Sequence, residues 1–314
     1  SSNTPKEFVD AVKQGALYWN RYFDKNVIEV VTAPEGRVAP DSEYNIIQWV
    51  PWEAAGFAYA DAQMDPRTGE IRHAQVFMTS VFAVSGKTNA VRLLEAVSKG
   101  QVSLSRGLPI TLEGFESQQF CHYEALEQFV TKLQSLLAEG ADDAAFLNAS
   151  KDYVREVMAH EVGHTMGLRH NFAGSLEYNI PTAERMNFYK DYFEQPLDLE
   201  TVYPGNSVME YQPYIEAVIT GDLIEKTQRQ LNYDKLAIRA LYYQEKPVGK
   251  APLFCTDDHT SGDGAYNDCV RFNSGKNLAE GVASDLDAVD LFPVRVIDTF
   301  VKLKANLSKD NVHT

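Results

Sequence analysis

The segment 160–170 holds the residues best suited to metal chemistry, three histidines and a glutamate. His160, Glu161, His164, Gly167 and His170 make up the pattern HExxHxxGxxH. His160 and His164 are four residues apart, so on a helix both imidazoles leave the same face. Gly167 can adopt a positive φ, which ends the helix and turns the chain so that His170 returns as a third ligand. Three neutral imidazoles leave one zinc position open for water, which is typical of a catalytic zinc site.

The alternative for this segment is an ordinary helix whose histidines are exposed or hydrogen-bonded. The whole chain has seven histidines, and three of them fall in this one string. Such a concentration at the spacing of metal ligands favours the zinc interpretation. Glu161 follows the first ligand directly, so it can reach a water on the metal without ligating the ion, as a general base must.

A second signal lies downstream, in the segment 207–211. Its sequence is SVMEY, and it follows the turn-prone residues YPGN at 203–206. Met209 beneath a three-histidine site would provide a polarisable, apolar contact for the ligands. Tyr211, two residues later, could place its hydroxyl near the metal. Without the pattern at 160–170, which we call the zinc string, Met209 would be interpreted as an ordinary core methionine.

Hydrophobic periodicity predicts the elements that must position these residues. The zinc string lies at the end of a helix expected over 150–166, and residues 1–24 predict an N-terminal helix with a capping box at Thr4-Pro5-Lys6-Glu7. Residues 65–69 predict a hairpin turn, and 171–222 is expected to be irregular. Strands are predicted at four segments between the two helices: 26–33, 44–50, 57–63 and 70–84. Further helices are predicted at 123–137, 233–243 and 294–307.

Composition and charge narrow the class of protein. The chain has 314 residues, of which 44% are hydrophobic and 23% charged, and its formal net charge is −15. These proportions are close to globular averages, and the length is typical of two domains or subdomains. A net anion repels phosphate backbones, so nucleic acid is not expected to be a partner. No apolar run is long enough for a membrane helix, so no membrane span is expected.

Three cysteines, Cys121, Cys255 and Cys269, allow at most one internal disulfide. Cys255 and Cys269 close a short loop and are the pair best placed to bond, which would suit an exported protein. A reduced pair is equally compatible with the sequence. The acidic loop 257–268 between them could bind Ca²⁺ through carboxylates and carbonyls. It lacks the EF-hand spacing, however, and a solvated acidic loop is the simpler interpretation.

Together, the zinc string and SVMEY resemble the metzincin zinc metallopeptidases, which combine HExxHxxGxxH with a later methionine-containing turn, the Met-turn. The chain is most similar to the bacterial Met-zincin domain family, over residues 5–245. Three further segments carry this narrower resemblance: YWN at 18–20, DPRTGEI at 65–71 and HNFAG at 170–174. Asn171 is a departure, because the better-known metzincins have Glu, Pro, Ser or Asp after the third histidine. Substrate preferences are therefore not carried over from them.

The resemblance implies an α+β zincin fold of two subdomains with the zinc cleft between them. The upper subdomain, residues 1–170, would hold a twisted mixed β-sheet and two long helices, the second carrying His160 and His164. The lower subdomain, residues 171–314, would be mostly irregular and helical. It would begin at the third ligand and include the Met-turn, a C-terminal helix and the Cys255–Cys269 loop. An antiparallel edge strand within 70–81 would border the cleft and pair with an extended substrate.

For function, the resemblance implies a zinc-dependent endopeptidase with one catalytic Zn²⁺ that acts on peptide or protein substrates. Glu161 would take the proton of the attacking water and deliver it to the leaving amine, and Tyr211 would help to stabilise the oxyanion. The family also implies export to the periplasm, the outer surface or the medium. The chain opens on Ser1-Ser2-Asn3, and we expect a targeting segment and additional domains to lie outside it.

Two other functions fit the same zinc string. The chain could be a zinc-binding recognition module without proteolytic activity, although such a module has no need of Glu161 as a base. It could also be a zinc hydrolase of small amides or peptides. A cleft that is open at both ends would distinguish an endopeptidase from a hydrolase of small amides or peptides.

Overall fold

The computed structural model describes residues 1–51, 58–83, 142–180 and 197–260, together with the shorter pieces 91, 134, 140, 191–192, 269–271, 276–277 and 280. Its α-helices are α1 (Val9–Leu17), α4 (Asp143–Thr165), α6 (Tyr214–Lys226) and α7 (Asn232–Tyr243). Its strands are β1 (Ile46–Val50), β2 (Ala58–Met64) and β3 (Ile71–Thr79). Short 3-10 turns are η1 (Lys6–Phe8), η2 (Tyr18–Tyr22), η3 (Ser80–Phe82), η5 (Ser175–Glu177) and η7 (Asp257–His259). This mixed α/β architecture with a small mixed sheet is compatible with the expected α+β class.

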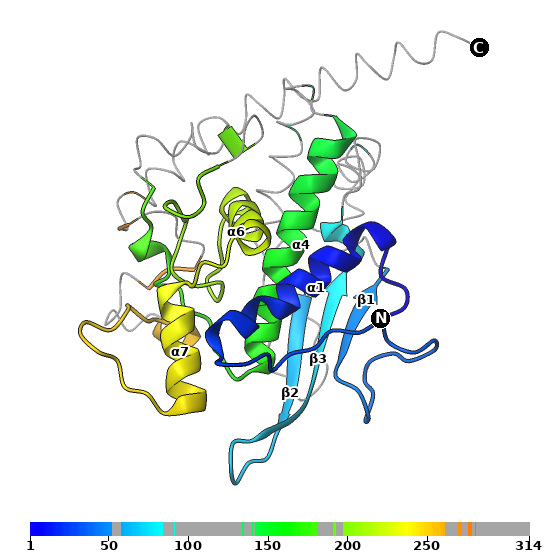
Figure 1. Ribbon diagram of the computed structural model, residues 1–314, viewed down its shortest axis with the longest axis horizontal. Helices are drawn as coiled ribbons and strands as arrows, with labels where there is room; N and C mark the ends of the chain where they lie inside the picture. Colours follow the sequence, from blue (N-terminus) through cyan, green and yellow to red (C-terminus); the bar gives the residue numbers. More distant parts are fainter. Residues whose placement is uncertain are drawn as a thin grey trace.

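Helix α4 runs through the centre of the molecule, between the sheet and α6, with α1 crossing it (Figure 1). It begins after the N-cap Asp142, whose carboxylate accepts a hydrogen bond from the Ala145 amide at 2.8 Å. The helix predicted over 150–166 is therefore present and starts earlier, at Asp143. Every residue from 152 to 163 is buried, so the first two residues of the zinc string lie inside the molecule.

The N-terminal segment packs on α4 at short range because Gly15 has no side chain. A Cβ atom at Gly15 would lie 2.3 Å from the carbonyl oxygen of Arg155. A few residues later, the indole N–H of Trp19 donates to the carbonyl oxygen of Ala159 at 2.8 Å. This close approach places Trp19 directly behind the metal-ligand turns of α4.

Two predictions about the N-terminal region are wrong. The helix predicted over 1–24 is present as η1, α1 and η2, but its capping box is not formed. The Thr4 hydroxyl instead donates to the carbonyl oxygen of Ser1 at 3.0 Å. The segment 26–33 forms no strand. Its β-branched residues predict one, but two of its backbone amides donate to the side-chain oxygen of Asn20 rather than to a neighbouring strand.

Within the described residues, three strands form one mixed sheet in the order β1-β3-β2. β1 runs parallel to β3, and β2 runs antiparallel to it. The predicted hairpin turn at 65–69 joins β2 to β3, where Gly69 has φ +73° and the Asp65 amide donates to the carbonyl oxygen of Glu70 at 2.9 Å. The other three predicted strands are thus present, at 44–50, 57–63 and 70–84, the last ending at β3 and η3.

The edge strand next to β3 is β2, so the assignment of the antiparallel edge strand to 70–81 is wrong. β3 is hydrogen-bonded to a strand on both sides. The far side of β1 is covered by the N-terminus, where the Trp49 amide donates to Ser1 Oγ at 2.8 Å and Asn3 Nδ2 donates to Trp49 O at 2.9 Å. β2 has a strand neighbour on one side only, among the residues described above. The hairpin turn in the sequence predicts that β2 pairs with β3, but it does not predict that β1 pairs with the other side of β3.

Helix α6 occupies the end of the segment 171–222, which was predicted to be irregular. Its residues from Glu216 to Ile224 are all buried, so no polar face marks a helical period. Gly221 lets α6 approach α4, because a Cβ atom there would lie 1.9 Å from the carbonyl oxygen of Asp152. The helix predicted at 233–243 is confirmed as α7.

Some predictions fall outside the described residues. These are Cys121, the helix at 123–137 apart from residue 134, and the helix at 294–307. The division into subdomains at residue 170 stays a prediction. Within the described ranges, no helix has both the length and the apolar character that crossing a membrane requires.

Candidate metal centre

Helix α4 ends in a Schellman motif directly after the second histidine. The Leu168 amide donates to Gly163 O at 3.1 Å, and the Gly167 amide donates to His164 O at 2.9 Å. Gly167 has φ +88°, the left-handed conformation expected from its place in the zinc string. The chain turns back at this point and brings His170 beside the end of the helix.

The three predicted histidine ligands converge on one point. Nε2 of His164 lies 3.1 Å from Nε2 of His160 and 3.1 Å from Nε2 of His170. His160 and His170 are buried, and His164 is half-buried. Nitrogens bound to one tetrahedral zinc ion would be about 3.4 Å apart. A small outward adjustment of the rings would therefore accommodate the ion.

Acceptors on the outer side of the rings determine which nitrogen faces the centre. Nδ1 of His160 lies 2.7 Å from Val208 O, and Nδ1 of His164 lies 2.9 Å from Leu168 O. A carbonyl oxygen only accepts, so both Nδ1 atoms carry the proton and both Nε2 atoms present a lone pair. Two lone pairs at 3.1 Å repel each other unless a cation lies between them. The arrangement therefore fits a metal ion bound by neutral imidazoles, as in catalytic zinc sites.

The third ligand is oriented by a carboxylate that sequence reasoning missed. Nδ1 of His170 lies 2.7 Å from Oδ2 of Asp257. Burial acts to raise the pKa of Asp257, but its hydrogen bond with His170 and the charge of Arg271 together lower that pKa below its usual value. The ionised carboxylate only accepts, so Nδ1 of His170 carries a proton and Nε2 is the nitrogen that faces the centre. The two residues are 87 positions apart, and the acidic loop around Asp257 was the only local signal.

Burial keeps the imidazoles of His160 and His164 neutral. Removal from water lowers the pKa of His160 well below its usual 6.5, and lowers that of His164 to about 3. The neighbouring histidines lower both values further, and the backbone carbonyl acceptors oppose the shift only in part. At neutral pH, these two ligands need not lose a proton before a metal binds.

Met209 lies against the helix that carries two of the ligands. A Cβ atom at Gly163 would lie 2.3 Å from Met209 Sδ and 2.6 Å from Trp19 Cζ2. A side chain at position 163 would therefore displace Met209 and Trp19. The same turn also provides the Val208 carbonyl that orients His160. The Met-turn thus contacts the ligand helix through both its side chain and its backbone.

A buried aspartate of α7 holds the Met-turn in place. Asp234 accepts hydrogen bonds from the Ser207 hydroxyl at 2.7 Å, the Val208 amide at 3.1 Å and the Tyr18 hydroxyl at 2.6 Å. Burial raises the pKa of Asp234 to about 6, and these hydrogen bonds limit the rise. Sequence reasoning missed Asp234, because its partners lie 26 to 216 positions away.

Tyr211 and Glu161 lie beside the histidine cluster. The Tyr211 ring stacks on His160 with centroids 5.6 Å apart, and its centroid lies 4.4 Å from that of His170. Glu161 follows His160 in α4 and is fully buried. Their predicted roles, Tyr211 as an oxyanion donor and Glu161 as the base, stay predictions with which this placement is compatible.

Cys255 and Cys269 form a disulfide, with Cα atoms 5.8 Å apart. One of the two states considered from the sequence is thus present. Calcium binding by the loop between them is not supported. Asp257 faces the histidine cluster and Asp258 forms an ion pair with an arginine at 2.7 Å, whereas 261–268 falls outside the described residues.

A second group of carboxylates, Asp152, Asp222 and Glu225, lies between α4 and α6. Arg155 is buried and pairs with Asp152 and, at 3.0 Å, with Glu225. Lys226 Nζ lies 2.6 Å from Asp222. Cations of the chain itself therefore compensate these carboxylates, and the group is an ion-pair network that joins the two helices.

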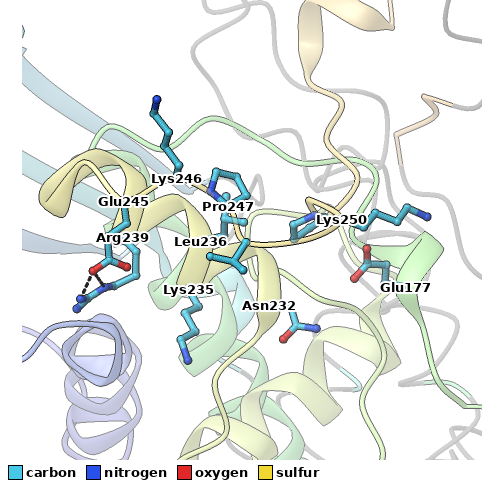
Figure 2. Close-up of a pocket in the computed structure, with 11 residues that line it drawn as sticks. Glu177, Asn232, Lys235, Leu236, Arg239, Glu245, Lys246, Pro247 and Lys250 are labelled. Atoms are coloured by element: carbon cyan, nitrogen blue, oxygen red, sulfur yellow. Dashed lines mark hydrogen bonds and ion pairs between the residues drawn. The ribbon is translucent and has the colours of Figure 1, made fainter.

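A surface pocket of about 340 Å³ lies apart from the histidines, between α7 and the loop that follows it (Figure 2). The ammonium groups of Lys235, Lys246 and Lys250 point in different directions (Figure 2). Arg239 is already paired with Glu245. The pocket therefore presents no converging charges of the kind that the histidine cluster provides.

One comparison with known proteins gave a match that includes this centre. Residues 145–249 match the family model described as Met-zincin. The match contains the whole zinc string and the Met-turn, and it ends before the Cys255–Cys269 loop. The comparisons with curated proteins and with solved structures gave no match. Over residues 145–249, about a third of the chain, the sequence therefore matches the metzincin-type family Met-zincin.

Proposed function

We propose that this protein is a zinc-dependent endopeptidase. The observation that carries the proposal is the convergence of three imidazoles. Nε2 of His164 lies 3.1 Å from Nε2 of each of the other two, and an outer acceptor holds each Nδ1. The Met-zincin match over the same segment supports a zinc metallopeptidase. Glu161 favours hydrolysis over a pure binding module, because metal binding alone needs no base.

The residues of the site have different roles in the proposed hydrolysis of a peptide bond. A zinc ion held by the three histidines would act as a Lewis acid on the scissile carbonyl and would acidify the attacking water. Glu161 accepts the proton of that water and transfers it to the nitrogen of the leaving amine. Tyr211 donates its hydroxyl hydrogen to the oxyanion that forms as the water attacks. Its ring contacts with His160 and His170 support this role, because they hold the ring beside two of the ligands.

We further propose that an extended substrate pairs with β2 by strand addition. β2 is antiparallel to β3 and, in the described part of the sheet, has a strand on one side only. The sheet also reaches the metal-ligand loop, since a Cβ atom at Gly167 would lie 3.4 Å from Ile71 Cδ1 at the start of β3. A peptide along β2 would therefore run toward the histidine cluster.

The proposed setting is outside the cytosol, where the enzyme acts on peptide or protein substrates. The Cys255–Cys269 disulfide supports this setting, because disulfides persist mainly in oxidising compartments. Additional domains beyond this chain belong to the same proposal. They would direct the enzyme to its substrates or restrain it.

Digestion of a diverse peptide library, analysed by mass spectrometry, tests the proposed activity. The protein is assayed as purified, after zinc is removed with a chelator, and after zinc is restored. We expect internal cleavages that disappear with the chelator and return with zinc. His164→Ala is the control, and it should lose both zinc and cleavage. Cleavage restricted to peptide ends would favour the small-peptide hydrolase, and the absence of any cleavage would contradict a peptidase.

A further inference from the structure

The segment 253–259 lies against the loop that carries the third ligand. The Phe172 amide donates to Cys255 O at 2.8 Å. The Asn171 side chain donates from Nδ2 to Leu253 O at 3.2 Å, and its Oδ1 accepts from the Cys255 amide at 3.2 Å. The two segments therefore pair almost as strands do, with one amide side chain in place of a backbone peptide group.

Asn171 is the residue that departs from the better-known metzincins, and this pairing gives it a function. An amide side chain both donates and accepts, which an ionised carboxylate or a proline cannot do. Asn171 is fully buried, and its backbone amide donates to Met209 O at 2.9 Å. A single residue thus joins the Met-turn to the segment 253–259.

The disulfide fastens this segment at Cys255. Arg271 follows Cys269 closely and reaches back to Asp257, where its Nη2 lies 2.8 Å from Oδ1. Asp257 itself follows Cys255 closely, so the disulfide brings the carboxylate and the guanidinium together. Both cysteines are buried in a small apolar cluster with Phe172, Ala173 and Tyr211.

We propose that the segment 253–259 completes the zinc centre: Asp257 is a positioning residue for His170, and the Cys255–Cys269 bond together with Arg271 keeps this carboxylate on Nδ1 of that ligand. This role presupposes the proposed zinc function. It lies beyond the family match, which ends at residue 249. A carboxylate behind a ligating imidazole fixes the orientation of the ring and makes the metal-facing nitrogen more basic.

The three ligands differ in the strength of this support. His160 and His164 direct Nδ1 at neutral backbone carbonyls, whereas His170 directs it at a carboxylate. His170 also lies outside the helix, in a loop, so its ring depends on packing from another segment for its direction. Metal retention should therefore be most sensitive to Asp257.

Zinc affinity measured by competition with a chromogenic chelator tests the role of Asp257. We expect Asp257→Ala to weaken zinc binding by about 10- to 100-fold. Asp257→Asn keeps an acceptor oxygen and should weaken it less. Asp258→Asn is the matched control, because Asp258 lies in the same turn but its side chain is 66% exposed and pairs with Arg169. We expect no change in that variant.

Cobalt substitution separates positioning from general stability. Co²⁺ in a three-histidine site absorbs visible light, and its absorption follows the ligand geometry. We expect Asp257→Ala to change this spectrum and Asp258→Asn to leave it unchanged. A purely structural role would lower the thermal midpoint of unfolding without changing the spectrum, and that result would contradict positioning.

The disulfide is tested through its coupling to Asp257. We expect Cys255→Ser/Cys269→Ser and, separately, Arg271→Gln to weaken zinc binding severalfold. In an Asp257→Ala background, each change should weaken zinc binding less than it does in the wild type, because both act through that carboxylate. Arg271→Gln leaves the disulfide intact and so tests the coupling if the double serine variant does not fold.

The failures of the two proposals are distinguishable. Wild-type zinc affinity in Asp257→Ala would overturn the positioning role. Fully independent effects of Arg271→Gln and Asp257→Ala would overturn the proposal that Arg271 keeps Asp257 on His170. A wild-type protein that binds no zinc would instead overturn the proposed function itself.

Discussion

At the scale of single residues, Tyr211 combines two contributions that one substitution can separate. Tyr211→Phe keeps the ring that packs on His160 and His170 but removes the hydroxyl. We expect kcat to fall by about 10²-fold, because a donor to the oxyanion is lost, while zinc content and KM change little. Tyr203→Phe, at a half-buried tyrosine in another region, is the matched control. An unchanged kcat would show that Tyr211 contributes only through the packing of its ring.

The residues that could be predicted are those whose relationship is local. His160, His164 and Gly167 are set by the period of one helix and the turn that ends it. Asp234 and Asp257 could not be predicted, because each acts on a segment that only the folded chain brings near. Asp234 reaches the Met-turn across 26 positions, and Asp257 reaches its histidine across 87.

At the scale of elements, the contact between α4 and α6 gives a test in which two effects have opposite signs. Helix propensity favours Ala over Gly by about 1 kcal/mol. A Cβ atom at Gly221, however, would lie 1.9 Å from the Asp152 carbonyl oxygen, so the helices would have to separate. We expect Gly221→Ala to lower the free energy of unfolding by about 1–3 kcal/mol, measured by urea denaturation. A stabilised variant would contradict the close approach of the two helices.

Glu210 makes the stability of the Met-turn depend on pH. Burial raises the pKa of Glu210 to about 8, although its carboxylate accepts a hydrogen bond from the Ser175 amide at 3.1 Å. Between its usual pKa of 4.5 and about 8, the folded protein holds a proton on Glu210 that the unfolded chain releases. The contribution of this group is therefore fully present below pH 4.5 and is lost as the pH rises toward 8.

Glu210→Gln mimics the protonated carboxyl and should remove this dependence. We expect the stability of the variant relative to the wild type to increase with pH, by up to about 1.4 kcal/mol per pH unit in this window. Urea unfolding of both proteins at about pH 5 and about pH 8 measures the difference. Equal pH dependence in the two proteins would show that Glu210 is ionised in the folded state.

Elements with one buried and one exposed face could be predicted from their hydrophobic period, whereas α6 could not. α1, α7 and the strands of the hairpin alternate between apolar and polar residues at a recognisable period. α6 has no such alternation, because it is buried on almost every side. The error at 26–33 has a different cause, since a side chain of η2 satisfies backbone groups that a neighbouring strand would otherwise pair with.

At the scale of the whole molecule, the metal centre is assembled from segments spread along the chain. α4 and the loop after it provide the ligands, and the Met-turn packs beneath them. α7 supports that turn through Asp234, while the N-terminal segment supports it through Tyr18 and Trp19. Residues before 145, and Asp257 beyond 249, thus contact the family-matched segment at its centre. Experiments on the site therefore need the whole chain.

The zinc peptidase function is tested most directly by comparing the wild type with Glu161→Gln in two assays on the same samples. Elemental analysis measures zinc per chain, and mass spectrometry of a digested peptide library measures cleavage. Gln keeps the shape of the side chain but cannot take a proton as a carboxylate does. We predict about one zinc ion per chain in both proteins and cleavage slower by about 10²- to 10⁴-fold in the variant. Equal cleavage by both proteins would contradict Glu161 as the base, and zinc in neither would contradict the metal centre itself.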